Sequence, residues 1–132
     1  EDVGYYGNVS IHLIKHSDII FLKYLLGIIN SSLVLFYAIE KKLILGAEKG
    51  SKKTPQIRKG AMDKLPIINV ASSSQKMIAL IVDKILAITK TEDYSINPEK
   101  QEKVKEHEHK IDQMVYKLYE LTPKEIKIVE LQ

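Results

Sequence analysis

Residues 111–130, IDQMVYKLYELTPKEIKIVE, decide how the C-terminal part of this chain folds. Up to Leu121 the apolar residues recur every three or four positions, which predicts an amphipathic helix. Thr122 then offers a hydroxyl to cap a second helix, and Pro123 suits the first helical position because that position needs no N–H donor. Glu125 follows Thr122 by three residues and completes a capping box. The stretch therefore predicts a helix, a capped break and a short C-terminal helix.

Two segments with heptad-like apolar spacing, the second of which includes the start of this stretch, predict an antiparallel helical hairpin. The first helix is expected over residues 75–90, capped by Ser73 or Ser74, with isoleucines at a heptad spacing. The second is expected over residues 99–121, after a short polar loop, and a short loop makes consecutive helices antiparallel. This register pairs Ile85 with Val104 and Ile78 with Ile111. The aromatic residues after position 114 then extend beyond the first helix, and must pack against the N-terminal half or a neighbouring domain.

The N-terminal half predicts a mixture of short strands and one long helix. Alternating apolar residues favour a strand from Val9 to Ile14, and a strongly apolar run favours a core helix from about Ile19 to Leu43. Gly27 and Ser31 share a face of that helix, so another segment can approach it closely. A glycine-punctuated loop with one short strand, a single helical turn and an extended Leu65–Ile68 follow. We expect a predominantly helical α+β fold, with residues 1–70 forming a small mixed portion and residues 71–132 forming the hairpin and terminal helix.

Composition places the chain among folded proteins without disulfides. It has 132 residues, 45% hydrophobic and 28% charged, and no cysteine. These values favour a packed core in a reducing cytoplasm. The apolar run after Ile19 is interrupted by Lys23 and by polar residues at 30–32, so a buried core helix is favoured over a membrane span. The chain opens on Glu1-Asp2 without an initiator methionine, which predicts a fragment of a longer protein.

A basic segment is the best sequence signal for a ligand. Between positions 41 and 64 eight basic and two acidic residues give a net charge of +6, so the remainder carries −3 of the total +3. Such a segment indicates a polyanionic partner, although an ordinary solvated lysine-rich loop has the same composition. Arginine and glutamine also suit guanine and adenine edges in the major groove. The candidate DNA-binding residues are Lys49, Lys52, Lys53, Thr54, Gln56, Arg58 and Lys59.

No catalytic residue is predicted in this chain. The sequence has no phosphate-binding glycine loop, no cysteine nucleophile and no Asn-Pro-Pro-Tyr box. His107 and His109 lie two positions apart on a predicted helix and point in different directions, so we expect no metal site there.

Four blocks of the sequence resemble one protein family. They are Lys23–Leu33, Gln56–Ile67, Gln75–Leu86 and Ile111–Glu130. Together they are similar to the TaqI-like C-terminal specificity domain of type IIG restriction–modification enzymes and adenine-specific DNA methyltransferases. The closing pattern I-D-x-x-V-Y-x-L-Y-x-L-T-x-x-E-I-x-x-V-E is the most specific of the four.

The resemblance implies a module that recognises a sequence in double-stranded DNA and is not catalytic by itself. The methyltransferase and nuclease domains would lie in the same or a partner chain, together with their S-adenosylmethionine and Mg²⁺. Two alternatives stay open: a fragment of a type I restriction specificity subunit, and a purely structural helical module without DNA contact. The hairpin helices also allow a homodimer.

Overall fold

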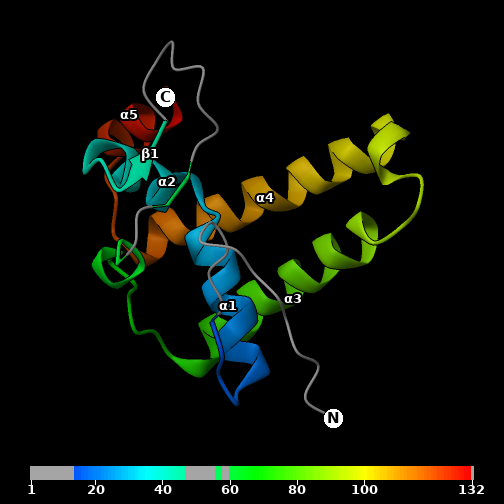
Figure 1. Cartoon of the computed structure of the whole chain (residues 1–132), viewed down its shortest axis with the longest axis horizontal. Helices are drawn as coiled ribbons and strands as arrows, with labels where there is room; N and C mark the ends of the chain where they lie inside the picture. Colours follow the sequence, from blue (N-terminus) through cyan, green and yellow to red (C-terminus); the bar gives the residue numbers. More distant parts are fainter. Residues whose placement is uncertain (1–13, 47–55, 58–59, 132) are drawn as a thin grey trace.

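The computed structural model describes residues 14–46, 56–57 and 60–131 (Figure 1). The prediction of a predominantly helical α+β fold is confirmed, because the described residues form helices and one pair of two-residue strands. The elements in chain order are α1 (Ile19–Ile29), α2 (Ser32–Glu40), β1 (Ile44–Leu45), β2 (Gln56–Ile57), the 3-10 turn η1 (Met62–Lys64), α3 (Ser72–Thr89), the 3-10 turn η2 (Tyr94–Ile96), α4 (Pro98–Leu118) and α5 (Pro123–Glu130).

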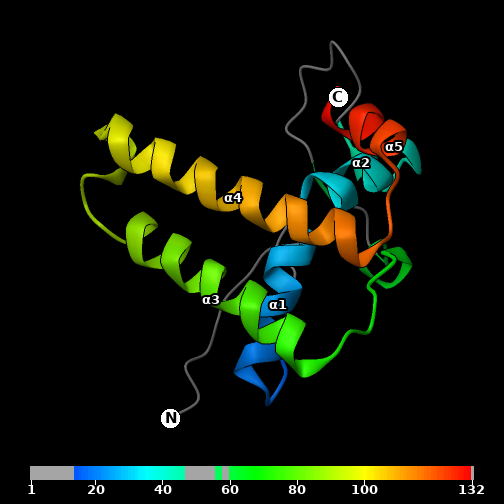
Figure 2. The same ribbon diagram turned by 180° about the vertical axis from the view of Figure 1, so that it is seen from behind.

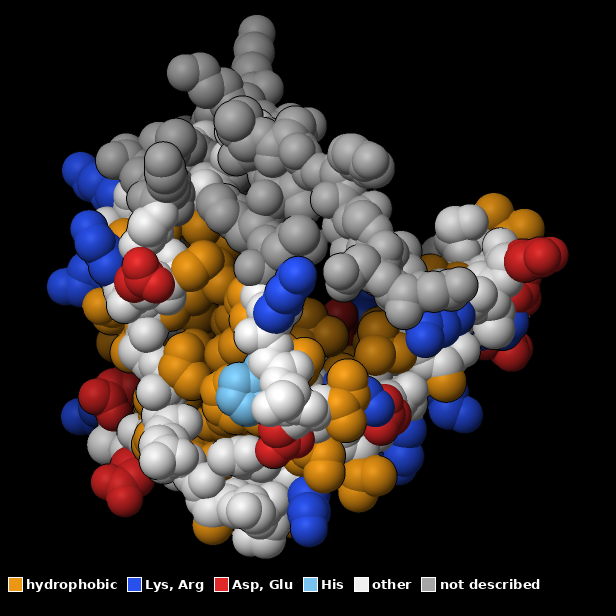
Figure 3. All heavy atoms as spheres, turned by 60° about the horizontal axis from the view of Figure 1, so that its bottom comes forward, with side chains coloured by type: hydrophobic (Ala, Val, Ile, Leu, Met, Phe, Trp, Pro, Cys, Tyr) orange, Lys and Arg blue, Asp and Glu red, His pale blue; other side chains and the backbone are white. Residues whose placement is uncertain are grey.

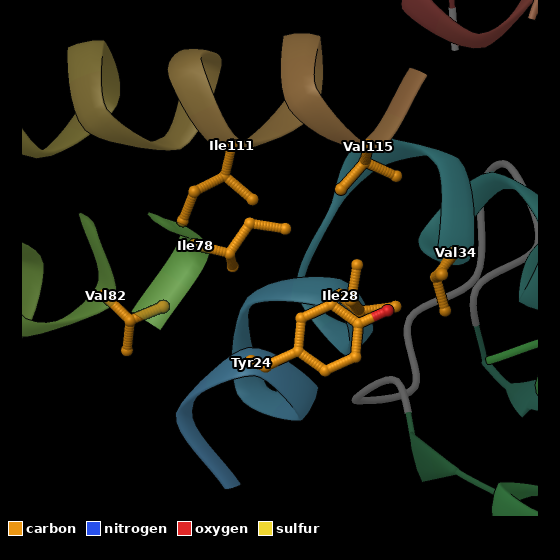
Figure 4. Packing of buried hydrophobic residues seen from close by; sticks show 7 residues of the cluster. All are labelled: Tyr24, Ile28, Val34, Ile78, Val82, Ile111 and Val115. Carbon is orange, nitrogen blue, oxygen red and sulfur yellow. The ribbon is translucent and has the colours of Figure 1, made fainter. Parts of the chain in front are cut away.

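Helices α3 and α4 form the predicted hairpin, and α1 crosses it. Figures 1 and 2 show the two long helices joined by a loop at one end, with α1 lying across them toward the other end. The core lies at this crossing, where Ile78 of α3 sits beside Ile111 of α4 as the predicted register requires (Figure 4). Tyr24 and Ile28 of α1 are almost completely buried there. The core therefore draws on both halves of the sequence.

The prediction of one continuous helix over residues 19–43 is wrong. The helix breaks at Asn30-Ser31 into α1 and α2, which are bent by 59°. Ser31 is extended, with ψ 151°. Its hydroxyl donates to the Ile28 carbonyl of α1 at 2.6 Å and accepts from the Val34 amide of α2 at 3.4 Å, so it ends one helix and caps the next. Among the described helices none is by itself long and apolar enough to cross a membrane, and only the bent α1–α2 pair reaches the required length when taken together.

Capping residues set most other helix boundaries. Asp18 accepts from the Ile20 amide at the start of α1, and Thr122 and Glu125 form the predicted capping box of α5. Helix α3 differs from the prediction: it begins at Ser72 after Ala71, without a side-chain cap, so neither Ser73 nor Ser74 is the cap.

The second hairpin helix ends at Leu118 and not at Leu121 as predicted. Glu120 adopts a left-handed conformation, with φ 56°. The Leu121 amide donates to the Tyr116 carbonyl and the Glu120 amide to the Lys117 carbonyl, which is the Schellman arrangement. This termination turns the chain away from the hairpin and toward α5.

A glycine at position 120 is expected to stabilise the protein. Because a residue with a Cβ pays about 1 kcal/mol in the left-handed region, Glu120→Gly should raise the free energy of unfolding by up to that amount. Lys103→Gly, an exposed substitution inside α4, should lower it by about 1 kcal/mol. Urea denaturation of both variants measures the difference. Equal losses for the two would contradict the role of Glu120 as the helix-terminating residue.

The aromatic end of α4 packs against the N-terminal half, the first of the two predicted alternatives. Val115 and Tyr116 are buried, and the Tyr119 hydroxyl donates to the Pro66 carbonyl at 2.5 Å and accepts from the Ile68 amide at 3.1 Å. The Tyr24 hydroxyl donates to the Ile68 carbonyl at 2.7 Å, and burial, with a smaller contribution from Tyr119, raises the pKa of Tyr24 to about 12. Two tyrosines from different helices thus satisfy both backbone groups of one residue in the extended linker.

Candidate nucleic-acid interface

The predicted DNA-binding residues fall mostly outside the described part of the chain. Residues Lys49, Lys52, Lys53, Thr54, Arg58 and Lys59 are among those that the structure does not describe. Gln56 is described: it begins β2, is exposed, and pairs with Leu45 of β1. An exposed amide at this point can reach a ligand without any rearrangement of the core.

A small apolar cluster holds the strand pair on the helical framework. Ala38 of α2, Leu43 and Ala61 are buried together, and Ile44 and Leu65 pack against them. Ile44 in turn pairs with Ile57, so β1 and β2 are antiparallel neighbours. The residues on either side of the lysine-rich segment are therefore paired neighbours, held against the helical framework by this cluster.

Two glycines and one lysine beside the strand pair have positive φ, the left-handed conformation that occurs in turns. Gly46 directly follows β1 with φ 78°, and Gly60 precedes η1 with φ 74°. Lys42 has φ 54° and occupies the same Schellman position after α2 that Glu120 occupies after α4, since the Leu43 amide donates to the Ala38 carbonyl. Turn residues with positive φ thus precede β1 and follow both strands.

Three lysines of the basic segment 41–64 lie in the described part of the chain, beside α2 and in η1. Lys41, Lys42 and Lys64 are exposed, and the Lys41 ammonium lies 5.9 Å from the centre of the Tyr37 ring. Glu40 and Asp63 are exposed beside them and reduce the local charge. The described residues at the ends of the lysine-rich segment therefore carry more positive than negative charge, with both signs present.

The described residues do not form a metal centre. Among residues 14–46, 56–57 and 60–131 no three His, Asp or Glu side chains come together as metal ligands. Asp112, which lies on the face of α4 toward α2, has both carboxylate oxygens engaged by Ser32, at 2.8 Å to the amide and 2.6 Å to the hydroxyl.

His107 is a buried titratable group in the hairpin seam. It is 8% exposed, and within the described part of the chain its Nδ1 has no hydrogen-bond partner. Burial lowers the pKa of His107, and Lys110, Lys84 and Lys103 lower it further, while Glu106 opposes them weakly. His109, two positions along, is exposed to solvent. The pair thus lies as predicted, with one histidine in the seam and one outside it.

We expect the protein to lose stability on mild acidification because of His107. Its pKa is lower in the folded than in the unfolded protein, where it is about 6.5, so the unfolded state binds more protons as the pH falls below that value. The contribution is complete above pH 6.5 and is lost as the pH drops toward the folded pKa. Urea denaturation at steps between pH 7 and 5 measures it. His107→Leu should flatten this slope and His109→Leu should not; equal slopes in all three proteins would refute the assignment.

The contact between Ser32 and Asp112 was not predicted from the sequence. Asn30-Ser31-Ser32 contains the residue types that cap helices, and this signal could have located the break. The acceptor on Asp112 could not be found in the same way, because it lies 80 positions further along the chain.

The four blocks that carry the family resemblance contact one another in the structure. Gly27 in the first block packs on Ile78 in the third and Ile111 in the fourth, and Tyr119 in the fourth bonds to Pro66 in the second. Their recognisable residues thus hold the helices together. No family model, curated protein or solved structure matches this chain, so its family stays a prediction.

Proposed function

We propose that this chain is the DNA-recognition module of a restriction–modification enzyme, an adenine DNA methyltransferase or endonuclease, and is not catalytic by itself. The observation that supports this most is the charge of residues 41–64, a net +6 in a chain whose remainder is negative. Nucleic-acid affinity arises mainly from phosphate neutralisation by lysine and arginine. The strand pair at Gln56 gives this segment a fixed base on the helical framework.

In this proposal the two parts of the molecule have different tasks. The basic segment contacts double-stranded DNA, with Lys49, Lys52, Lys53 and Lys59 on phosphates and Thr54, Gln56 and Arg58 near base edges. The hairpin of α3 and α4 sets its distance from methyltransferase and nuclease domains of the same or a partner chain. We propose a cytoplasmic location, which suits both a DNA partner and a chain without cysteine.

Binding to a labelled DNA duplex tests the proposal. The variant with Lys52, Lys53, Arg58 and Lys59 all changed to Glu should bind much more weakly than the unchanged chain. The slope of its log–log salt dependence should fall by roughly one unit for each phosphate that the variant no longer neutralises. Fluorescence anisotropy at two salt concentrations gives both quantities.

A matched control distinguishes binding at the basic segment from non-specific attraction of DNA to any positive surface. Lys103, Lys105, Lys110 and Lys117 are exposed on α4, and changing these four to Glu alters the net charge by the same amount. This variant should retain most of the affinity. If both variants lose affinity equally, the binding is non-specific; if the unchanged chain does not bind, the structural helical module is favoured.

A further inference from the structure

A cavity lies where α1 crosses the hairpin, beside the close contact at Gly27. It has a volume of about 340 Å³, which is within the range of ligand pockets in proteins. Its described lining comes from α1, from the junction of α1 with α2, and from α3 and α4. Figure 3 shows that hydrophobic side chains gather in hollowed areas on one face of the molecule. The cavity is thus a concave site built by the packed helices.

One part of the lining is apolar and can hold a hydrocarbon group. It consists of Leu26 of α1, of Val82, Ile85 and Leu86 of α3, and of Ile111 of α4. Val82 and Ile111 belong to the buried core, whereas Leu26 is 44% exposed. A ligand group that covers Leu26 removes apolar surface from water, and this favours binding.

The charged part of the lining is acidic. Glu108 and Asp112 lie one turn apart on α4, so their Cβ atoms are about 5–6 Å from each other. None of the described lining residues is basic. Asp112 already accepts two hydrogen bonds from Ser32, and within the described part of the chain Glu108 is in no ion pair. Two like charges at this spacing repel each other, so a cation beside them is favoured.

We propose that this cavity binds a small organic cation, one that carries a single planar positive group, such as an amidinium, on an apolar body. The apolar body lies against Leu26 and Leu86, and the positive group pairs with the carboxylate of Glu108. The two carboxylates repel anions, so this site is separate from the basic segment that we propose for DNA. Its test is therefore independent of DNA binding.

Three probes of nearly the same shape and different charge test the proposal on the full chain: benzamidinium, neutral benzamide and benzoate. Amide chemical shifts of the isotope-labelled protein, followed during titration, give both the affinity and the place of binding. We expect benzamidinium to bind about tenfold more tightly than benzamide, and benzoate to bind more weakly than either. The largest shifts should fall on Leu26, Asn30 and Asp112. Equal affinities for benzamidinium and benzamide, or no shifts at the cavity, would overturn the proposal.

Exposed positions allow variants that separate the charged and the apolar part of the site. Glu108→Gln should weaken benzamidinium binding about fivefold, the upper range for an exposed ion pair, and leave benzamide binding unchanged. Leu26→Ala should weaken both probes about threefold, since part of the apolar wall is lost. The matched control Glu106→Gln removes the same charge from a position of α4 outside the lining, and should change neither affinity. If Glu106→Gln and Glu108→Gln weaken benzamidinium binding equally, the net charge and not the cavity attracts the cation, and the proposal fails.

Discussion

Replacing Gly27 by valine is expected to lower the free energy of unfolding by about 3 kcal/mol, the upper end of the cost of overpacking a core. A Cβ at this position would lie 2.7 Å from Cγ2 of Ile78 and 3.2 Å from Cγ2 of Val82. Both atoms are methyl groups bound directly to the Cβ of a β-branched residue in a helix, where one χ1 rotamer dominates. They cannot move aside without displacing α3 from α1.

Alanine at position 27 gives a sharper version of the same test. On an exposed helix, replacing glycine by alanine raises the free energy of unfolding by about 1 kcal/mol. If Gly27→Ala lowers the free energy of unfolding instead, the loss must come from the clash of the new Cβ with α3. In an Ile78→Ala background, which itself should cost about 2–5 kcal/mol, the nearest obstructing methyl is gone. Gly27→Ala should then become neutral or stabilising. Urea denaturation of the four proteins measures this coupling, and an unchanged effect of Gly27→Ala in both backgrounds would contradict the packing explanation.

Replacing Asp112 by alanine is expected to cost about 2 kcal/mol, because it leaves two donors of Ser32 without their acceptor in a partly buried position. The carboxylate also lies at the N-terminus of α2, where the helix dipole favours negative charge. Both effects act on the break between α1 and α2. Thermal or urea denaturation measures the loss.

Conservative variants separate the contributions of this contact. Asp112→Asn keeps one oxygen acceptor and should lose less than Asp112→Ala, whereas Ser32→Ala removes the hydroxyl bond alone. Glu108→Ala, an exposed carboxylate one turn earlier on α4, is the matched control and should change stability by less than about 0.5 kcal/mol. If Asp112→Ala costs no more than Glu108→Ala, the long-range cap contributes nothing to stability.

The two variants act on the same junction from different sides. Gly27 sets how closely α1 approaches the hairpin, and Asp112 fixes where α2 begins after the bend. The buried Ser31 lies between them and caps α2. Helix α2 leads directly to Lys41, Lys42 and β1, so this junction determines where the framework presents the candidate DNA-binding segment.

The candidate DNA interface was predictable from sequence only as a charge pattern. A run of lysines is a property of composition, and it locates the segment without fixing the direction of any side chain. Of the seven predicted residues the described structure places Gln56, as an exposed residue of β2. The lysines at 41 and 42 belong to the same basic run, and their place in the turn after α2 follows from packing of Leu43 in the core.

The sequence by itself determined the features that depend on neighbours within about four residues, namely the helical periods and the Thr122–Glu125 capping box, and the short loop between two apolar seams was enough to predict the antiparallel hairpin. Tertiary structure decided the rest. The apolar run over residues 19–43 favoured one long helix, and it breaks where Ser31 caps α2 and Asp112, 80 positions away, binds Ser32. The crossing at Gly27 and the two tyrosines on Ile68 depend likewise on partners from distant segments. Such contacts form only when the helices pack, so no local pattern in the sequence encodes them.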